Sequence, residues 1–256
     1  MISMKNYTLI FLASLLFFSC SPTRYIHKPL IISGLEEKGE HVISGNFATT
    51  IDSKNFNING SYAISNHIIL QSSYTFRDDY ADEMYSYKTT GNGFDVSLGY
   101  TNNTKEKNFY FEGFLGYGIG KINNTNTLSI DSYANFKYNK IFSQLNSNIK
   151  FDKISKTNNY FSLHFPIRLE YLNYNKTAIN NFSQQIGQSE TKSLLENPNI
   201  FIWSIGKTLS YNLENVTFSV FGSLHSPTNA TSFVTLQYAY VGFGVNFRNF
   251  LKRKKN

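Results

Sequence analysis

Cysteine is almost absent from this sequence, since Cys20 is the only one in 256 residues. A lone thiol is a hazard in an oxidising compartment, so its retention needs a reason. Long hydrophobic runs are also scarce. The mean hydropathy is −0.30, and the apolar stretch at residues 9–18 is shorter than the roughly 20 residues of a helical membrane span. The sequence therefore excludes a helical membrane segment after its leader.

Motifs for a metal or a nucleotide are missing as well. The histidines, at positions 27, 41, 67, 164 and 225, have no metal-ligand spacing. The glycine-rich GYGIG at 116–120 lies inside a strand pattern and is not followed by a helix pattern, so it does not predict a phosphate loop. Its glycines suit a sharply curved strand instead. We expect no cofactor and no metal.

Positive charge is not concentrated in the body of the chain. The net charge is +7, but Lys5 lies in the leader and residues 252–255 (KRKK) carry four positive charges. Residues 20–251 therefore carry only +2, which excludes a basic face that tracks nucleic-acid phosphates. The tail at 251–256 is expected either beside anionic headgroups or as a solvated end.

The first nineteen residues have the pattern of a signal peptide. Lys5 precedes the apolar core at 9–18, and Ser19 is the small residue before a cut. The FFSC that ends in Cys20 resembles a bacterial lipobox, with Phe17 where leucine is usual. This resemblance implies that the Cys20 thiol carries a diacylglyceryl group, and residues 20–39 are then a lipidated tether. An ordinary secretory signal with a chance cysteine is the alternative.

The composition that remains is typical of strands and turns. Aromatic residues make up 16% of the chain, mostly Tyr and Phe. Apolar and polar residues alternate with period two, as in residues 56–64, where Phe56, Ile58 and Tyr62 oppose Asn57 and Asn59. About ten strands (8–10) are predicted, at 41–49, 56–64, 68–76, 93–100, 108–120, 137–151, 160–172, 200–211, 216–224 and 233–247.

The connections between these segments alternate in length. Short turns are expected near 65–67, 102–108, 153–159 and 212–215, and long polar segments near 78–91, 122–136 and 174–199. This pattern predicts an all-β, antiparallel, up-and-down membrane β-barrel over residues 40–250, with short periplasmic turns and long outer loops. Both ends of the barrel sequence then lie at the short-turn end, where a lipid in the inner leaflet could hold Cys20.

The last strand resembles the C-terminal signal that the bacterial barrel-assembly machinery reads. Tyr240, Gly242, Val245 and Phe247 occupy its characteristic places, although Tyr240 is a weak fit and nine residues follow Phe247. The resemblance implies the assembly machinery as a partner during biogenesis.

The whole mature chain resembles the uncharacterised outer-membrane β-barrel lipoproteins of the Bacteroidetes type. The points of resemblance are Cys20, Tyr25, KPL at 28–30, EKGE at 37–40 and ISNH at 64–67. The resemblance implies a lipid-anchored protein of the cell outer membrane, with membrane lipid as its partner. Such proteins generally have no assigned activity, and we expect a monomer.

The candidate site is a set of charged and polar residues on the polar strand faces, which a narrow barrel would bring into its lumen. A paired charge network that fills the barrel is favoured over a catalytic or proton-handling carboxylate with His164, because buried charges need partners. Adjacent His225 and Ser226 point to opposite faces of a strand and cannot readily form a catalytic dyad. The candidate lumen residues are Arg77, Asp95, Glu112, His164, Arg168 and Glu170.

Three functional hypotheses remain open from the sequence. The first is a non-enzymatic outer-membrane barrel with a structural, adhesive or surface-binding role. The second is a barrel enzyme that modifies lipids. The third is a soluble periplasmic lipoprotein barrel whose apolar faces point inward around an apolar ligand.

Overall fold

The chain forms ten strands in a computed structural model, which describes residues 30, 32–49, 53–79, 87–103, 108–126, 133–151, 159–180, 198–213, 215–227 and 238–249. Each strand except β1 is at least eleven residues long. The strands are β1 (His41–Thr49), β2 (Ser53–Ala63), β3 (Ile68–Asp79), β4 (Tyr87–Thr101), β5 (Phe109–Asn126), β6 (Tyr133–Lys150), β7 (Tyr160–Asn180), β8 (Asn199–Asn212), β9 (Val216–Pro227) and β10 (Tyr238–Arg248).

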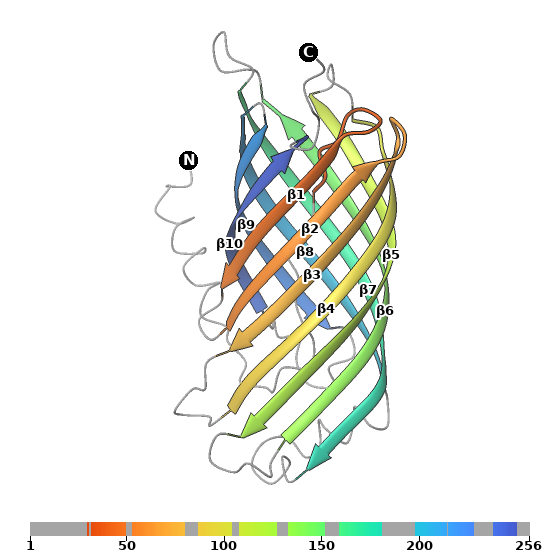
Figure 1. Ribbon diagram of the computed structural model, residues 1–256, viewed down its shortest axis with the longest axis vertical. Coiled ribbons are helices and arrows are strands. Elements are labelled where there is room, and N and C mark those ends of the chain that lie inside the picture. The colour runs from red at the N-terminus through yellow and green to blue at the C-terminus, as the bar shows by residue number, and fades with distance from the viewer. Residues whose placement is uncertain are drawn as a thin grey trace, which may run out of the picture.

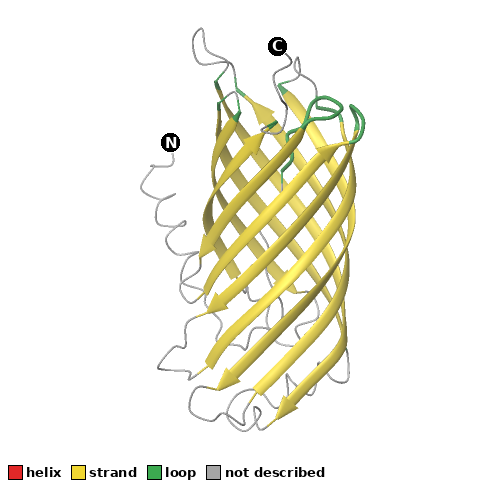
Figure 2. Ribbon diagram, viewed as in Figure 1, coloured by secondary structure: helices red, strands yellow, loops and turns green. Residues whose placement is uncertain are grey.

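The strands close into one barrel in which each pairs antiparallel with its sequence neighbours (Figure 1). β1 closes the ring by pairing with β10, with Val42 opposite Arg248 and Thr49 opposite Val241. Figure 2 shows strands and loops throughout the described ranges. Within those ranges, no helix is long and apolar enough to cross a membrane. The predicted fold class, including the count of ten strands, is confirmed.

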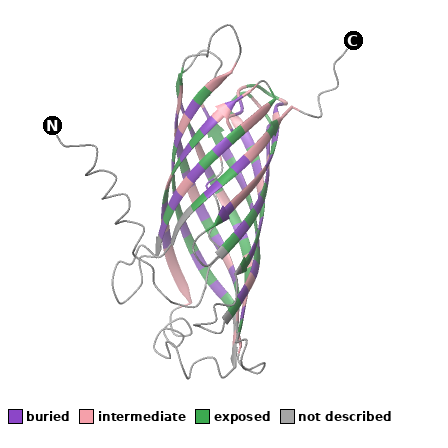
Figure 3. Ribbon diagram, turned by 90° about the vertical axis from the view of Figure 1, so that its left-hand side faces the viewer, coloured by how far each residue is buried: buried purple, intermediate pink, exposed green. Residues whose placement is uncertain are grey.

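Most of the large apolar side chains point away from the barrel axis, and most of the polar ones that are buried point toward it. Buried and exposed positions alternate along most strands (Figure 3). Tyr62, Tyr74, Leu98 and Leu169 are between 42% and 53% exposed, whereas the Asn57 side chain is fully buried. The period-two pattern therefore places Tyr, Phe and Leu outward. This burial pattern contradicts the hypothesis of a soluble barrel with an apolar interior.

The predicted short turns lie at one end of the barrel and the predicted long segments at the other, but their lengths overlap. The short-turn end holds 64–67, 102–108, 151–159 and 213–215, and the long-loop end holds the widest gaps, 181–198 and 228–237, together with the narrow gaps 50–52 and 127–132. The strands β4 to β7 extend further toward the long-loop end than the sequence predicts (Figure 1). The prediction is wrong there because outward residues of these extensions, such as Asn92, Lys121 and Asn123, are polar. The inward residues of the β5, β6 and β7 extensions include the apolar Ile122, Phe136 and Tyr174. The apolar face of the pattern therefore changes sides within each strand, and the simple alternation of an apolar outer face is lost.

The N-terminal segment occupies the short-turn end of the lumen. We call Leu30 and residues 32–40 the N-terminal plug. Leu35 is 1% exposed and packs in an apolar cluster with Val42, Ala63, Ile69 and Phe114. The prediction of a tether over residues 20–39, with the barrel beginning near residue 40, therefore needs correction for the described part. Those residues fill space inside the barrel, and a pattern without period-two alternation cannot reveal such packing.

Candidate functional site

The centre of the lumen holds a compact cluster of four charged side chains, which we call the central charge cluster: Asp95, Lys140, Arg168 and Glu170. The Lys140 ammonium lies 2.7 Å from Glu170 Oε1 and 3.2 Å from Asp95 Oδ2. The Arg168 guanidinium reaches Asp95 Oδ2 at 2.8 Å and Glu170 Oε1 at 2.9 Å. None of the four side chains is more than 4% exposed. Two cations thus balance two carboxylates in a buried site, as a stable buried network requires.

Strands β4, β6 and β7 supply the charges of this cluster, and β5 lies between β4 and β6. Asp95 is on β4, Lys140 on β6, and Arg168 and Glu170 are two residues apart on β7. The guanidinium carbon of Arg168 lies 3.7 Å from the centre of the Phe142 ring, which is a cation–π contact. The ring thereby covers one face of the cation and holds it against the carboxylates.

Three glycines of β5 make room for the inward side chains of β6. Gly116, Gly118 and Gly120 alternate with outward residues and pair in register with Phe142, Lys140 and Tyr138. A Cβ atom at Gly118 would overlap the Asp95 carboxylate, and one at Gly120 would overlap the Tyr138 ring. The GYGIG motif therefore serves close packing in the lumen.

Glu112 lies apart from the central charge cluster and holds the N-terminal plug. Its carboxylate accepts hydrogen bonds from the Ser33 hydroxyl, from the Ser33 amide at 3.3 Å and from the Gly34 amide at 2.9 Å. Gly34 has a φ of 60°, a conformation that favours glycine. Its carbonyl accepts bonds from Arg248 at 2.9 Å and from Asn103 at 3.2 Å. The plug is therefore fastened to three separate parts of the barrel wall.

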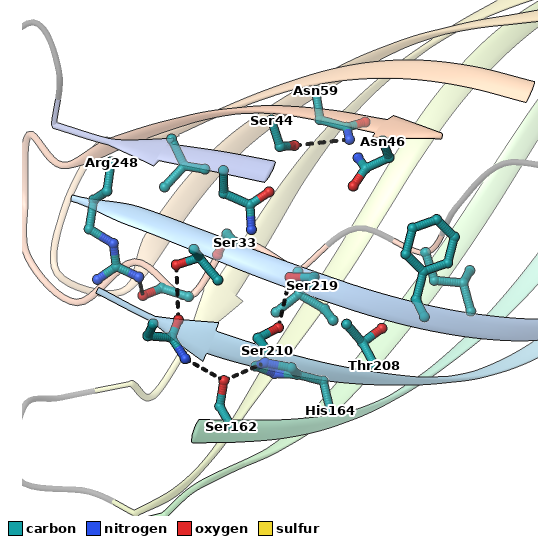
Figure 4. A pocket seen from close by; sticks show the side chains of 18 of the residues that line it. Ser33, Ser44, Asn46, Asn59, Ser162, His164, Thr208, Ser210, Ser219 and Arg248 are labelled. Carbon is teal, nitrogen blue, oxygen red and sulfur yellow. Dashed lines mark hydrogen bonds between the residues drawn. The ribbon is translucent and has the colours of Figure 1, made fainter. Parts of the chain in front are cut away.

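A polar cavity of about 60 Å³ lies between the plug and the barrel wall, with lining residues from β1, β2, β5 and β7 to β10. Figure 4 shows hydroxyl and amide groups around it, with Ser33 of the plug among them. The cavity has room for a few water molecules, each of which needs about 10–15 Å³. Asn59 Oδ1 faces this region and has no hydrogen-bond partner in the described structure. Its lining residues include Ser44, Asn59, Ser162, His164, Ser210 and Ser219.

His164 is a fully bonded member of this polar wall. Its Nδ1 lies 2.7 Å from Asn148 Oδ1 and its Nε2 lies 2.9 Å from the Ser162 hydroxyl. Because an amide oxygen can only accept, Nδ1 donates and Nε2 accepts from the hydroxyl. The structure does not bring His164 into contact with a carboxylate in the described residues, which disfavours the catalytic interpretation.

The long-loop end of the lumen holds an apolar cluster beside buried polar residues such as Asn124. We call this group the distal apolar cluster: Ile122, Phe136, Tyr138, Leu172, Tyr174 and Ile202. The Tyr174 ring makes edge contacts with Phe136 and Tyr138 at centroid distances of 5.9 Å and 5.7 Å. Tyr138 is two residues along β6 from Lys140, so the cluster stacks directly on the central charges. Arg77, which is 3% exposed, also points inward but is outside the central charge cluster.

His225 points into the barrel and is 2% exposed. Its two ring nitrogens lie 2.7 Å from the Ser204 hydroxyl and 2.9 Å from the Ser223 hydroxyl. It is therefore a buried, bonded core histidine. The side chain of Ser226 lies outside the description, as do Cys20 and residues 250–256. In the described ranges, no group of three or more His, Cys, Asp or Glu side chains could hold a metal ion.

Three features of this site are not predicted by the sequence pattern. Lys140 is not predicted in the lumen, because the strand at 137–151 alternates only weakly. The sequence assigns the glycines of β5 only to strand curvature. In the structure they also make room for side chains of neighbouring strands. The plug has no periodic signal at all. The signal that could have found Lys140 is its place two residues from Phe142 and Tyr138 on one face of a strand.

The residues of the predicted assembly signal lie in β10, the strand that closes the barrel against β1. Gly242 pairs with Ala48, Val245 with Gly45 and Phe247 with Ile43. A Cβ atom at Gly242 would meet the Phe47 carbonyl and the Phe221 ring, so the glycine has a packing role in the finished barrel. Recognition by the assembly machinery stays a prediction.

No protein-family model matches the chain, and no curated protein sequence matches it. The translocator domain of autotransporter NalP from Neisseria meningitidis is 9% identical, with 95% of this chain and 94% of that chain covered and a TM-score of 0.43. The N-terminal β-barrel domain of Pseudomonas aeruginosa OprF is 11% identical, with 82% and 98% covered and a TM-score of 0.34. LpxR from Salmonella typhimurium is 8% identical, with 81% and 99% covered and a TM-score of 0.37. These TM-scores are too low for any argument about this chain.

Proposed function

We propose that the chain is a non-enzymatic outer-membrane β-barrel protein with a sealed lumen, anchored additionally by a lipid on Cys20. Its role is structural or adhesive, or consists of binding at the long-loop end. The main support for the proposal is the filling of the lumen by side chains and by the N-terminal plug. Separate features of the barrel support its membrane placement, its seal and the absence of catalysis.

The outward apolar belt supports membrane placement. Along β5 the outward residues from Phe109 to Ile119 are apolar or glycine, and Lys121 follows. Ten residue steps of about 3.3 Å, tilted by about 40°, rise about 25 Å, which equals the apolar height of outer-membrane barrels. An exposed belt of this size would drive aggregation in water. A bilayer is the environment that such a surface fits.

Three layers inside the barrel support the sealed lumen. The N-terminal plug lies at the short-turn end, the central charge cluster lies in the middle, and the distal apolar cluster lies toward the long loops. A barrel of about ten strands leaves little interior space once side chains fill it. Diffusion of solutes through the lumen is therefore not expected.

The lipid-modifying enzyme is the second candidate, and the inward histidines disfavour it. Both His164 and His225 are bonded inside the lumen and at most 5% exposed. A group that acts on membrane lipids must reach the rim or the outer surface. Catalysis by these histidines would require the lumen to unpack.

Conductance and lipid analysis test the proposal together. We expect full-length protein in planar bilayers to give no steady conductance, while it migrates faster on gels when unboiled, as folded barrels do. Steady conductance would contradict the sealed lumen, and release of the protein by carbonate after removal of acyl chains would contradict the membrane barrel. Altered lipid A in cells that lack the protein would favour the enzyme instead.

The lipid on Cys20 is tested separately. We expect cells fed labelled palmitate to label the wild-type protein but not Cys20→Ser. Equal labelling of the two proteins, or none in either, would contradict lipidation. Neither outcome affects the barrel itself.

A further inference from the structure

Lysines from adjacent strands lie opposite one another on the outer wall near the long-loop end. In the strand register, Lys121 of β5 pairs with Asn92 of β4 on one side and with Lys137 of β6 on the other. Lys137 pairs in turn with Lys176 of β7. The side chains of Lys121 and Lys137 are exposed on the outer face of the wall, and we call these two residues the outer lysine pair.

The outer lysine pair is electrostatically unbalanced. Directly opposed residues of an antiparallel pair have Cβ atoms about 4.5–5.5 Å apart, and like charges at such positions repel. Among the described residues, no carboxylate forms an ion pair with the Lys121 or Lys137 ammonium. By contrast, Lys88 at the same end of the barrel lies 3.9 Å from Asp78. A bound anion would relieve the repulsion between the two lysines.

The pair lies at the height of lipid headgroups. Ile119 of β5 is exposed in the apolar belt, and Lys121 is the next outward residue, about 6.6 Å further along the strand. On β6, Ile141 is the last apolar outward residue before Asn139 and Lys137. An anion that meets both the apolar belt and the lysines therefore has a hydrocarbon part and a charged head.

Amide side chains beside the pair add hydrogen-bond donors and acceptors. Asn175 Nδ2 donates to Asn139 Oδ1 at 3.2 Å on the outer surface. Asn92 lies opposite Lys121 in the strand register, and Asn139 is the next outward residue after Lys137 along β6. Ammonium and amide groups together suit a phosphate, which offers several acceptor oxygens.

We propose that the outer lysine pair, with Asn139, binds the phosphate of an anionic lipid headgroup in the leaflet beside the long loops. The inference rests on the proposed membrane placement and adds a specific ligand class to it. In an outer membrane, the leaflet beside the long outer loops carries the phosphorylated glycolipid lipid A. The outer lysine pair is therefore assigned to a phosphate of lipid A. An anionic glycerophospholipid is the other lipid that could supply such a phosphate.

The test is lipid binding by full-length protein in a nonionic detergent, measured by native mass spectrometry and by the shift in unfolding temperature. The probes are lipid A, phosphatidylglycerol, phosphatidylethanolamine and inorganic phosphate. The variant is Lys121→Gln/Lys137→Gln, and the matched control is Lys88→Gln. Lys121→Arg/Lys137→Arg keeps the charge and shows whether charge alone suffices.

We expect wild type to bind lipid A and the double Gln variant to bind it roughly 10- to 30-fold more weakly, from the loss of two cations at a charged surface. Lys88→Gln and the double Arg variant should bind as wild type does. Tighter binding of phosphatidylglycerol than of lipid A, lost in the same variant, would identify a glycerophospholipid as the source. Full competition by inorganic phosphate would identify free phosphate as the ligand and overturn the lipid assignment.

Equal lipid A binding by wild type and the double Gln variant would overturn the proposal, as would equal binding of phosphatidylethanolamine. Faster migration of the unboiled variant verifies that it is folded. If the double Gln variant inserts into bilayers but no longer binds lipid A, the lysines are needed for lipid binding and not for membrane insertion. Protein that never inserts contradicts the placement itself.

Discussion

At the scale of single residues, the central charge cluster carries the largest electrostatic consequences. Asp95, Lys140, Arg168 and Glu170 are mutually paired and almost inaccessible to water. Removal of one partner leaves an uncompensated buried charge, whereas removal of an opposite pair keeps the site neutral. The cluster is therefore a sensitive test of how charges are accommodated in this barrel.

We expect Lys140→Met to lower the free energy of unfolding by about 3–5 kcal/mol, because Asp95 and Glu170 then share only Arg168. The double variant Lys140→Met/Glu170→Gln should recover a large part of that loss, since Asp95 and Arg168 remain as a neutral pair. Urea unfolding in vesicles, followed by the fluorescence of the single Trp203, measures both. Strict additivity of the two single changes would argue against the paired arrangement.

Gly118 offers a steric test of the same region. A valine there would place its branched side chain where the Asp95 carboxylate lies. We expect Gly118→Val to destabilise the barrel by about 1–3 kcal/mol, as overpacking does. Gly45, where an added Cβ would meet no atom within 4 Å, is the matched control, and Gly45→Ala should change stability little. Equal effects at both glycines would contradict the packing role of β5.

At the scale of elements, β8 carries an unusual cation within the apolar belt. Lys207 points outward between Ile205 and Leu209, and its ammonium lies 5.9 Å from the centre of the Phe165 ring. A lysine on the lipid face of a barrel costs about 2–4 kcal/mol at the mid-plane of the membrane. The ring contact and the long side chain reduce this cost only in part.

We therefore expect Lys207→Leu to stabilise the barrel in vesicles by about 2 kcal/mol. The control Lys88→Leu lies at the polar long-loop end and should give no such gain. Both variants are compared by the urea concentration at half-unfolding. A loss of stability in Lys207→Leu would mean that this lysine has a partner on the membrane side of the barrel.

The N-terminal plug is the second element whose fastening can be tested. In Glu112→Gln the carboxylate that accepts bonds from Ser33 and Gly34 becomes an amide with a single acceptor oxygen. We expect a loss of about 1–3 kcal/mol and faster hydrogen exchange of residues 32–36. Glu36→Gln is the control, because it weakens the pair with Lys150 and leaves the Glu112 carboxylate in place, so exchange at residues 33 and 34 should change less than in Glu112→Gln. Unchanged exchange in Glu112→Gln would contradict its role as the anchor.

At the scale of the whole molecule, the proposed seal involves more than one layer. We expect a chain that lacks residues 30–39 to remain non-conducting in planar bilayers, because the central charge cluster and the distal apolar cluster still fill the lumen. The conductance of planar bilayers is measured for the shortened chain and for the full-length protein under the same conditions. Steady conductance in the shortened chain alone would show that the plug is the single barrier.

The barrel itself can be predicted from local sequence patterns. Alternation of apolar and polar residues, as in Phe56 to Tyr62, predicts ten strands, and the lengths of the connections predict which ends lie together. This works because a strand displays its two faces at a period of two whatever its partners are. The burial of Arg77, Asp95, Glu112, His164, Arg168 and Glu170 follows from the same alternation once the polar face is assigned to the lumen.

Three dimensions are needed to know which face is inside, which of those polar residues meet, and what else enters the lumen. Alternation is the same for a barrel with a polar or an apolar interior, so the choice rests on the outward exposure of Leu98 and Tyr74 in the closed barrel. The pairing of Asp95 with Arg168, 73 residues apart, depends on strand register and on the space beside Gly118. The plug depends on contacts with Glu112 that are 78 and 79 residues away in sequence, and no local pattern encodes such distances.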